Sequence, residues 1–357
     1  MICTQFAILP SRPIEAADAR QADDGTSRQL SPTLPVSSLL DPETLAVLKR
    51  KRETEQADAN APKHCPSEEG ADEGQLATIR ECEVTTFYST SSYKHLRDLY
   101  KVSVTLRRIG GVPTEVFVPD AGIAQQNQHR VLINLHGGGF LIGARTNSHL
   151  ESAPVAATSR IEVISVDYRQ GPEYAFPAAS EDVASVYRDL IKTYRPANIG
   201  IYGCSAGGLL TAEAMAWFQK EHLPPPGAIG MFCEGAQYWS EGDSGVLFHA
   251  SVVGTPYEST STNPYFRGAD INDPLVFPAL SREVLSKFPP SLLISSTRDL
   301  SLSSVVHTHS LLVAQGVPAE LHVWEGLGHA FIYDPDLPSS REAYAVIAHF
   351  FDVHLGR

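Results

Sequence analysis

The stretch that decides the fold spans residues 199–208 and reads Ile-Gly-Ile-Tyr-Gly-Cys-Ser-Ala-Gly-Gly. Its apolar first half predicts a buried strand, and the residues that follow Ser205 are rich in Ala, Leu and Met, as in a helix. A Gly-x-Ser-x-Gly sequence between a strand and a helix predicts a sharp turn that holds the serine hydroxyl free at the edge of a sheet. Gly203 and Gly207 suit this turn because a Cβ at either position would collide with the neighbouring strand and helix. The alternative is an ordinary glycine-rich turn, which this strand–turn–helix context disfavours.

Near-continuous apolar runs on both sides of this turn indicate strands buried on both faces, as in a parallel sheet covered by helices. These runs lie at residues 131–135, 163–166, 199–202, 292–294 and 321–324. Alternation at residues 102–106 and 116–118 indicates antiparallel edge strands. Apolar residues at helical spacing separate the runs: Val183, Val186, Tyr187, Leu190 and Ile191, then Leu302, Val305, Val306, Leu312 and Val313, then a last helix from about Ser340. The chain therefore predicts an α/β fold with a mostly parallel central sheet flanked by helices.

The charge balance is acidic: 41 Asp and Glu against 28 Lys and Arg give a formal net charge of −13. A nucleic-acid binder needs a basic face to displace counterions from phosphates, so we expect no nucleic-acid partner. No apolar run approaches the roughly 20 residues that cross a bilayer, so we expect no stable membrane insertion. The apolar start ends at Pro10 with no basic residues before it, too short for a signal peptide, and a cytoplasmic location is expected.

The cysteine count favours free thiols. The chain has five cysteines and no Cys-x-x-Cys pair, a pattern that suits a reducing cytoplasm better than a disulfide framework. A disulfide between Cys65 and Cys82 is the disfavoured alternative.

Three consecutive glycines follow the strand at residues 131–135, in the sequence His136-Gly137-Gly138-Gly139-Phe140. Such a run loses backbone entropy on folding and needs a reason. Acyl transfer supplies one, because backbone N–H groups must approach an oxyanion that side chains would block. We expect Gly138 and Gly139 to donate, together with the N–H of Ala206, and His136 to be structural. A phosphate loop is excluded because the chain has neither Gly-x-Gly-x-x-Gly nor Gly-Lys-Ser/Thr.

A serine at such a turn needs a base, which in this strand–turn–helix arrangement comes from a loop before the last helix. His329 lies in that position, after the strand predicted to end at Trp324. The competing histidines fall on predicted helices or inside a strand: His307, His309, His349, His354 and His322.

The acid partner of this histidine is expected in the loop after a late strand. Asp299 comes just beyond the buried run at residues 292–297. Its carboxylate would hold the His329 ring in the right tautomer and stabilise the imidazolium. The alternatives are Asp270, Asp273 and Glu325, which we rate well below Asp299.

With these residues in view, the chain resembles the hormone-sensitive lipase family of esterases in its bacterial form. Order and spacing match over about residues 130–357, at residues 136–140, 166–173, 176–178, 203–208, 273–278, 289–290, 297–299 and 328–331. The resemblance implies the α/β-hydrolase fold and a carboxylic ester hydrolase without a cofactor. It also implies a small-molecule ester with a short to medium acyl chain as substrate, and it allows a homodimer.

Two residues depart from the family pattern. The position before the serine is usually Asp or Thr and here is Cys204, whose side chain we expect to point away from substrate. The family sequence Leu-Ala-Pro-Glu is here Gln170-Gly171-Pro172-Glu173. We expect Glu173 and Asp167 to be structural, pairing with Arg169 or local backbone behind the site.

The domain organisation implied is a catalytic domain with a cap. Residues 1–37 lack periodicity and are expected to be poorly ordered or draped over the body. Residues 38–100 form the N-terminal part of the cap, with a helix at 41–52 and a loop at 57–75. Residues 101–357 form the α/β-hydrolase domain, with a cap insertion at about 240–285. Aromatic residues in or near that insertion could line substrate pockets: Tyr238, Trp239, Phe248, Tyr257, Tyr265, Phe266 and Phe277.

The chemistry expected is acyl transfer through an acyl-enzyme, with Ser205 as nucleophile, His329 as base and Asp299 as acid. An amidase, a deacetylase or an arylformamidase would use the same residues. A non-catalytic binding protein on this scaffold is the alternative from a different class, and the presence of all three residues disfavours it. An interfacial lipase would need a large exposed apolar lid, and the insertion is too polar for one.

Overall fold

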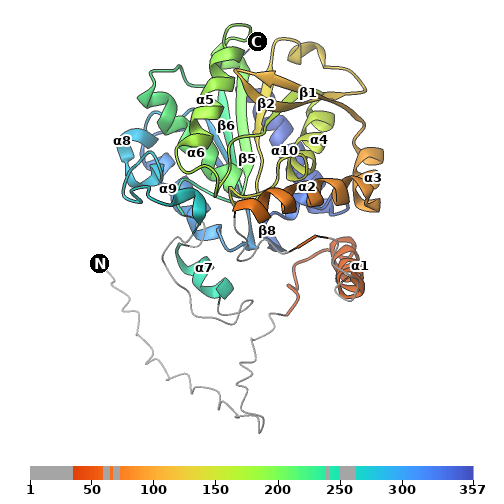
Figure 1. Cartoon of the computed structure of the whole chain (residues 1–357). Coiled ribbons are helices and arrows are strands. Elements are labelled where there is room, and N and C mark those ends of the chain that lie inside the picture. The colour runs from red at the N-terminus through yellow and green to blue at the C-terminus, as the bar shows by residue number, and fades with distance from the viewer. Residues whose placement is uncertain (1–34, 59–64, 67–72, 239–240, 250–262, 357) are drawn as a thin grey trace, which may run out of the picture.

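The computed structural model describes residues 35–58, 65–66, 73–238, 241–249 and 263–356. Its centre is one sheet of eight strands in the order β1-β2-β4-β3-β5-β6-β7-β8 (Figure 1). The β1–β2 and β2–β4 pairs are antiparallel, and all later pairs are parallel. This sheet confirms the predicted fold class. The strands are β1 Val102–Ile109, β2 Val112–Pro119, β3 Val131–Leu135, β4 Glu162–Val166, β5 Ile199–Cys204, β6 Ala228–Phe232, β7 Ser291–Arg298 and β8 Ala319–Gly328.

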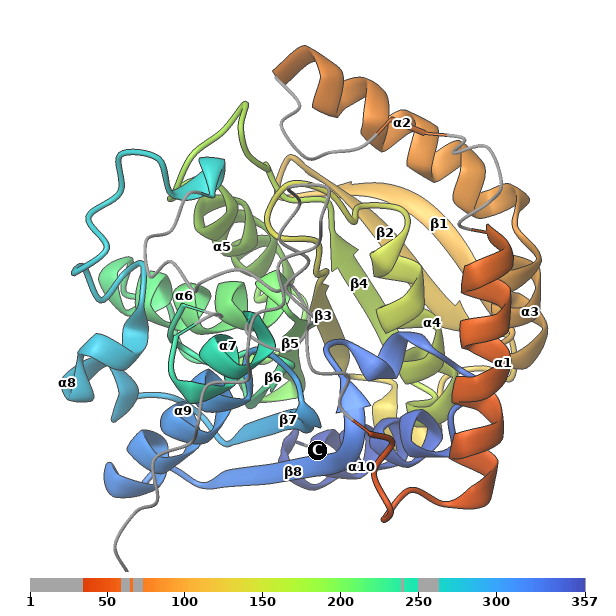
Figure 2. The same cartoon turned by 90° about the horizontal axis from the view of Figure 1, so that it is seen from below.

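Helices cover both faces of the sheet (Figures 1 and 2). One face packs against α5, α6 and α9, and the other packs against α4 and α10. The central strands β3 and β5 are buried along their whole length, which explains their near-continuous apolar sequence. The helices are α1 Pro42–Asp58, α2 Glu73–Ser89, α3 Ser91–Leu99, α4 Asn147–Ser159, α5 Ala178–Leu190, α6 Ala206–Lys220, α7 Asp243–Phe248, α8 Arg282–Leu285, α9 Leu302–Ala314 and α10 Pro338–His354.

Strand β6 has no counterpart among the predicted runs. Its sequence, Ala-Ile-Gly-Met-Phe, contains two small residues that break the apolar run. The glycine has a packing reason: a Cβ on Gly230 would lie 2.6 Å from the Phe232 ring and 3.0 Å from Tyr202 Cβ. Close packing therefore requires small residues in this strand, and a pattern of bulky apolar residues does not predict it.

The N-terminal segment is more helical than expected. The helix expected at residues 41–52 extends over Pro42–Asp58, and the loop expected to reach residue 75 ends where α2 begins at Glu73. Helices α2 and α3 were not predicted as separate elements. Figure 2 shows α2 beside the loops at one end of the sheet. Of the expected draped segment 1–37, residues 1–34 lie outside the described residues.

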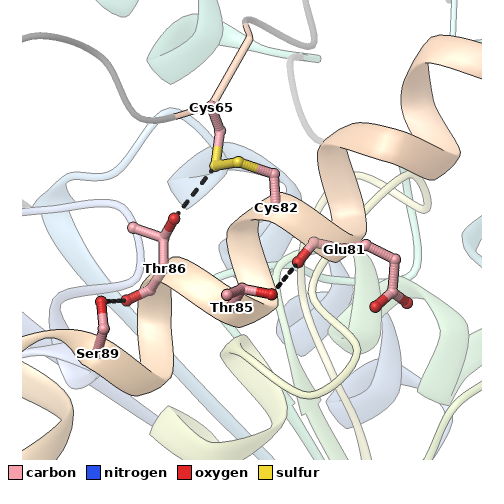
Figure 3. The surroundings of a disulfide bond; sticks show 6 residues. All are labelled: Cys65, Glu81, Cys82, Thr85, Thr86 and Ser89. Atoms are coloured by element: carbon pink, nitrogen blue, oxygen red, sulfur yellow. Dashed lines mark hydrogen bonds between the residues drawn. A yellow bond between two sulfur atoms is a disulfide. The ribbon is translucent and has the colours of Figure 1, made fainter.

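The expectation of free thiols is wrong for one pair of cysteines. Cys65 and Cys82 form a disulfide across 17 positions of the sequence (Figure 3). Cys82 lies on α2, so the bond ties the preceding segment to that helix. Cys204 and Cys233 are free and buried. The odd number of cysteines argued against a disulfide, but the distance between Cys65 and Cys82 is set by the tertiary fold and not by the count.

Two late elements also differ from expectation. In α9, Val305 and Leu312 are buried as predicted, whereas Val306 and Val313 are 41% and 52% exposed, so the buried stripe is narrower than expected. Strand β8 continues past Trp324 to Gly328, which brings the chain directly to His329.

Within the described ranges, every helix is too short or too polar to cross a bilayer.

Candidate active site

Ser205 occupies the tight turn between β5 and α6. Its backbone has φ 57° and ψ −125°, a conformation that a non-glycine residue adopts only when its surroundings enforce it. The two glycines of the turn are required by space. A Cβ on Gly203 would lie 2.2 Å from the carbonyl oxygen of Leu135, and one on Gly207 would lie 1.7 Å from the same atom. The turn therefore has the compact geometry that the sequence predicts.

His329 joins Ser205 to Asp299. Its Nε2 lies 2.8 Å from Ser205 Oγ, and its Nδ1 lies 2.6 Å from Asp299 Oδ1. The three residues follow the ends of β5, β7 and β8. Arg298 of β7 pairs with Gly328 of β8, so the residues that follow these two positions start side by side. Parallel pairing thus brings together side chains that are 30 and 124 positions apart in the sequence.

The Asp299 carboxylate is fully buried, whereas the His329 side chain is 24% exposed. Asp299 Oδ2 accepts from Ser295 Oγ at 3.0 Å, and Oδ1 also accepts from the Ser301 N–H at 2.9 Å. A carboxylate held this way accepts a proton-bearing Nδ1, which leaves Nε2 as the acceptor that faces Ser205. The hydrogen bonds therefore fix both the ring orientation and its tautomer.

The rejected acids lie elsewhere. Asp270 accepts from Asn272, Asp273 accepts from the Leu275 N–H, and Glu325 accepts from Ser37 Oγ at 2.6 Å. The rejected histidines lie on α9, on α10 or in β8, as predicted.

The glycine loop follows β3 and turns beside Ser205. Gly138 and Gly139 have φ values of 121° and 61°, and a Cβ on Gly138 would lie 2.2 Å from the carbonyl oxygen of Ile142. Within the described part of the chain, no acceptor takes the N–H groups of Gly138, Gly139 or Ala206. These three donors are therefore free to bind an anionic oxygen.

His136 is completely buried. Its ring stacks on Tyr168 with centroids 4.4 Å apart, and its Nδ1 lies 2.9 Å from the Gly137 carbonyl oxygen. Burial lowers the pKa of His136 to about 4, so the ring is neutral at physiological pH. This environment is that of a structural histidine.

Cys204 is completely buried in the core between the sheet and helices α4 and α10, beside Tyr202 and Phe232. Burial raises the pKa of its thiol well above the usual value, so the reactive thiolate is disfavoured.

The expected pairing of Glu173 needs correction. Arg169 binds Asp182 and Glu181 instead, and Glu173 binds Arg80 of α2 at 2.7 Å. Burial raises the pKa of Asp167 to about 6, and the N–H of Asp167 donates to the Pro113 carbonyl. No local pattern predicts this role of Arg80, because the pairing spans 93 positions.

Segments from both expected cap regions contact the loops of this site. From the later region, Asn263 Nδ2 donates to the Gly139 carbonyl at 2.7 Å, and Ser244 Oγ of α7 donates to the Leu300 carbonyl at 2.7 Å. From the earlier region, Arg80 donates to the Leu141 carbonyl at 2.6 Å. Four of the expected aromatic residues are buried in the core on the side of the sheet that α5, α6 and α9 cover: Tyr238, Tyr265, Phe266 and Phe277. Trp239 and Tyr257 lie outside the described residues.

Sequence reasoning missed three side chains that support the site. Ser295 binds Asp299, and the buried Glu151 and Tyr333 bind each other at 2.6 Å behind Ser205. A charged residue inside the apolar, small-residue stretch of α4 was the available signal for Glu151. Among the described residues, no cluster of His, Cys, Asp or Glu could hold a metal ion.

Comparison with known proteins gives concordant matches. A family model described as the alpha/beta hydrolase fold matches residues 132–333. The chain is 27% identical to an acetyl-hydrolase of Streptomyces hygroscopicus, over 64% of this chain and 77% of the relative. It is 26% identical to the esterase LipI of Mycobacterium tuberculosis, over 66% of this chain and 75% of the relative.

Solved structures are similar over most of the chain. The structure of an esterase E25 has a TM-score of 0.72 and 27% identity, and covers 91% of this chain and 97% of its own. An esterase from the bacterial hormone-sensitive lipase (HSL) family has a TM-score of 0.70 and 26% identity, with 89% and 99% covered.

Proposed function

The chain belongs to the α/β-hydrolase fold family, in its bacterial hormone-sensitive-lipase-like branch, and from that premise we propose that it hydrolyses carboxylic esters with Ser205 as nucleophile. The observation that carries the proposal is the continuous hydrogen-bonded chain from Asp299 through His329 to Ser205. A serine hydroxyl is a weak nucleophile until a base takes its proton, and this geometry places such a base 2.8 Å away.

In the acylation step, His329 Nε2 takes the proton from Ser205 as Oγ attacks the ester carbonyl carbon. The carbonyl π electrons move to oxygen, and the N–H groups of Gly138, Gly139 and Ala206 receive the resulting oxyanion. Each such donor contributes about 3 kcal/mol at the transition state. Collapse of the intermediate breaks the bond to the alcohol, which leaves with the proton that His329 returns.

Deacylation repeats these steps with water. His329 removes a proton from water, the hydroxide attacks the acyl carbon, and Ser205 leaves with the proton. Asp299 keeps its negative charge throughout and stabilises the imidazolium at each stage. All groups in this sequence belong to the chain, so the proposed reaction needs no cofactor.

The proposed substrate is a small-molecule ester with a short to medium acyl chain. Relatives named acetyl-hydrolase and esterase support this class. We propose that residues 38–100 and about 240–285 cap the site, which the contacts of Arg80 and Asn263 support. A homodimer completes the proposal, and the cytoplasmic location expected from the sequence has one observation against it. The Cys65–Cys82 disulfide weighs against the cytoplasm, because such bonds persist mainly in oxidising compartments.

Hydrolysis of p-nitrophenyl esters from acetate to palmitate tests this function. Wild type should turn over the short esters fastest, and Ser205→Ala and His329→Ala should each lose at least about 1,000-fold in kcat. His309→Ala is the matched control, because this histidine lies on α9 away from the site. Wild type that hydrolyses no ester would overturn the proposal. Amide and formamide substrates would then test the related hydrolases, and phosphonate labelling of Ser205 would test the binding-protein alternative.

A further inference from the structure

Glu151 is a completely buried carboxylate near the middle of α4, the helix that follows the glycine loop. A buried carboxylate is expensive unless its oxygens are fully hydrogen-bonded. In the described part of the chain no Arg, Lys or His forms an ion pair with it. The presence of a buried carboxylate without a cationic partner therefore needs an explanation other than an ion pair.

The carboxylate receives four hydrogen bonds. Oε1 accepts from the Gly137 N–H at 2.7 Å and from Tyr333 Oη at 2.6 Å. Oε2 accepts from Asn134 Nδ2 at 2.8 Å and from the Cys204 N–H at 3.3 Å. These donors come from β3, from the glycine loop, from the residue before Ser205, and from the short helix Phe331–Tyr333 that follows His329. One side chain thus binds every segment that carries a proposed reacting group except the Asp299 loop.

The hydrogen-bond donors around Glu151 suit its ionised form, although its burial does not. A carboxylate offers about four lone-pair positions and no donor, and the backbone N–H groups and the Asn134 amide can only donate here. Burial raises the pKa of Glu151 to about 7, while the bonds from Tyr333, Gly137, Asn134 and Cys204 oppose that rise. Above neutral pH all four bonds can therefore be charge-assisted.

The bonded segments meet directly behind Ser205. A Cβ on Gly137 would lie 2.4 Å from Tyr333 Oη, 2.8 Å from the Cys204 carbonyl oxygen and 3.3 Å from Ser205 Cβ. The segments that carry Gly137, Cys204 and Tyr333 are therefore in close contact at this point. A shift of any one of them changes the shape of the site beside Ser205. The hydrogen bonds of the carboxylate go to Asn134, Gly137, Cys204 and Tyr333, and none goes to the side chains of Ser205 or His329.

We propose that Glu151 is a positioning residue for ester hydrolysis. Its carboxylate holds the glycine loop, the residue before Ser205 and the segment after His329 at the separations that attack and oxyanion binding require. The inference rests on the proposed ester hydrolysis. Misplacement of reacting groups by about 1 Å can lower the rate about 100-fold while leaving substrate affinity nearly unchanged.

Kinetics of Glu151→Gln on p-nitrophenyl acetate test the role. The amide keeps the size of the side chain but turns one oxygen into a donor that faces two other donors. We expect kcat to fall 10- to 100-fold with KM within threefold. Tyr333→Phe removes one of the four bonds and leaves the carboxylate, so its kcat should fall about three- to tenfold. Glu213→Gln is the matched control, because Glu213 is equally buried on α6 and binds Ser180 and none of the four partners of Glu151.

Amide hydrogen exchange provides a readout that needs no turnover. The N–H groups of Gly137 and Cys204 should exchange faster in Glu151→Gln than in wild type or Glu213→Gln. This readout separates the two proposals, because wild type inactive on esters would refute the function while exchange still tests the positioning. Folded Glu151→Gln with kcat within twofold of wild type, or with unchanged exchange at both amides, would overturn the inference. If Glu151→Gln does not fold, Tyr333→Phe with wild-type kcat would overturn it.

Discussion

Arg80 of α2 and Glu173 of the loop after β4 form a bidentate ion pair, with Nη1–Oε1 and Nη2–Oε2 distances of 2.7 and 3.0 Å. The same guanidinium donates to the carbonyl oxygens of Leu141 and Gly171, at 2.6 and 2.5 Å. Leu141 follows the glycine loop directly. One side chain from the N-terminal helices therefore holds two loops beside the candidate site.

Replacing Arg80 should weaken both loops. Arg80→Met removes four hydrogen bonds from a side chain that is 20% exposed, so we expect the free energy of unfolding to fall by about 2 kcal/mol. Arg80→Lys should recover little of it, since an ammonium cannot reproduce the planar fork. Urea denaturation measures the change, with Arg107→Met, an exposed β1 residue, as control. Equal stability of the Arg80 and Arg107 variants would contradict the prediction.

The contacts of Arg80 illustrate what the sequence could and could not predict. Local sequence patterns were sufficient to predict β3, β5 and the turn at Ser205. Burial on both faces selects apolar residues in a continuous run, and steric crowding selects glycines beside the serine. His329 and Asp299 followed from their places after late strands. Local patterns did not predict the partners of Arg80 and Glu151. These contacts join separate segments of the chain and depend on how the helices dock. Strand β6 was missed for a different reason: its small residues are the result of close packing.

The Cys65–Cys82 disulfide should stabilise the attachment of the N-terminal segment to α2. Closing a loop of this length removes about 3 kcal/mol of chain entropy from the unfolded state. We therefore expect a reducing agent to lower the melting temperature of wild type. Cys82→Ser should melt at the lower temperature with or without the reductant. An unchanged melting temperature of wild type after reduction of the disulfide would contradict the prediction.

Gly137 should tolerate no side chain. The Cβ of Gly137→Ala would overlap Tyr333 Oη and the Cys204 carbonyl oxygen, so the glycine loop must move away from Ser205. We expect kcat on p-nitrophenyl acetate to fall at least about 100-fold. Gly316→Ala is the control: its Cβ would enter open space at φ 77°, which costs about 1 kcal/mol of stability and leaves kcat unchanged. Retention of wild-type kcat by Gly137→Ala would show that the loop adapts.

Cys204 should be dispensable for the chemistry despite its place beside Ser205. Its thiol is buried and protonated, so Cys204→Ala should keep kcat within about threefold of wild type. The smaller side chain leaves a cavity, and we expect the free energy of unfolding to fall by about 1–2 kcal/mol. A loss of activity as large as that of Ser205→Ala would instead assign the thiol a part in catalysis.

Glu151 should make wild type less stable as the pH rises. Because its folded pKa of about 7 exceeds the ordinary 4.5, the folded state binds the proton more tightly than the unfolded chain. Stability from this group is therefore complete below about pH 4.5 and is lost as the pH rises to about 7, by about 3 kcal/mol. Glu151→Gln cannot ionise, so its free energy of unfolding, relative to wild type, should increase between pH 5 and pH 8.

Urea denaturation of both proteins at several pH values measures this difference, and comparing them cancels every other titrating group. Glu283→Gln is an opposite-sign control. A hydrogen bond from Lys287 lowers the pKa of Glu283, so that carboxylate stabilises the fold above pH 4.5 and loses its contribution as the pH falls. The difference between Glu283→Gln and wild type should therefore stay constant between pH 5 and pH 8, and change slightly in the other direction below about pH 4.5. A difference between Glu151→Gln and wild type that stays constant with pH would mean that Glu151 ionises as readily in the fold as in water, despite its complete burial.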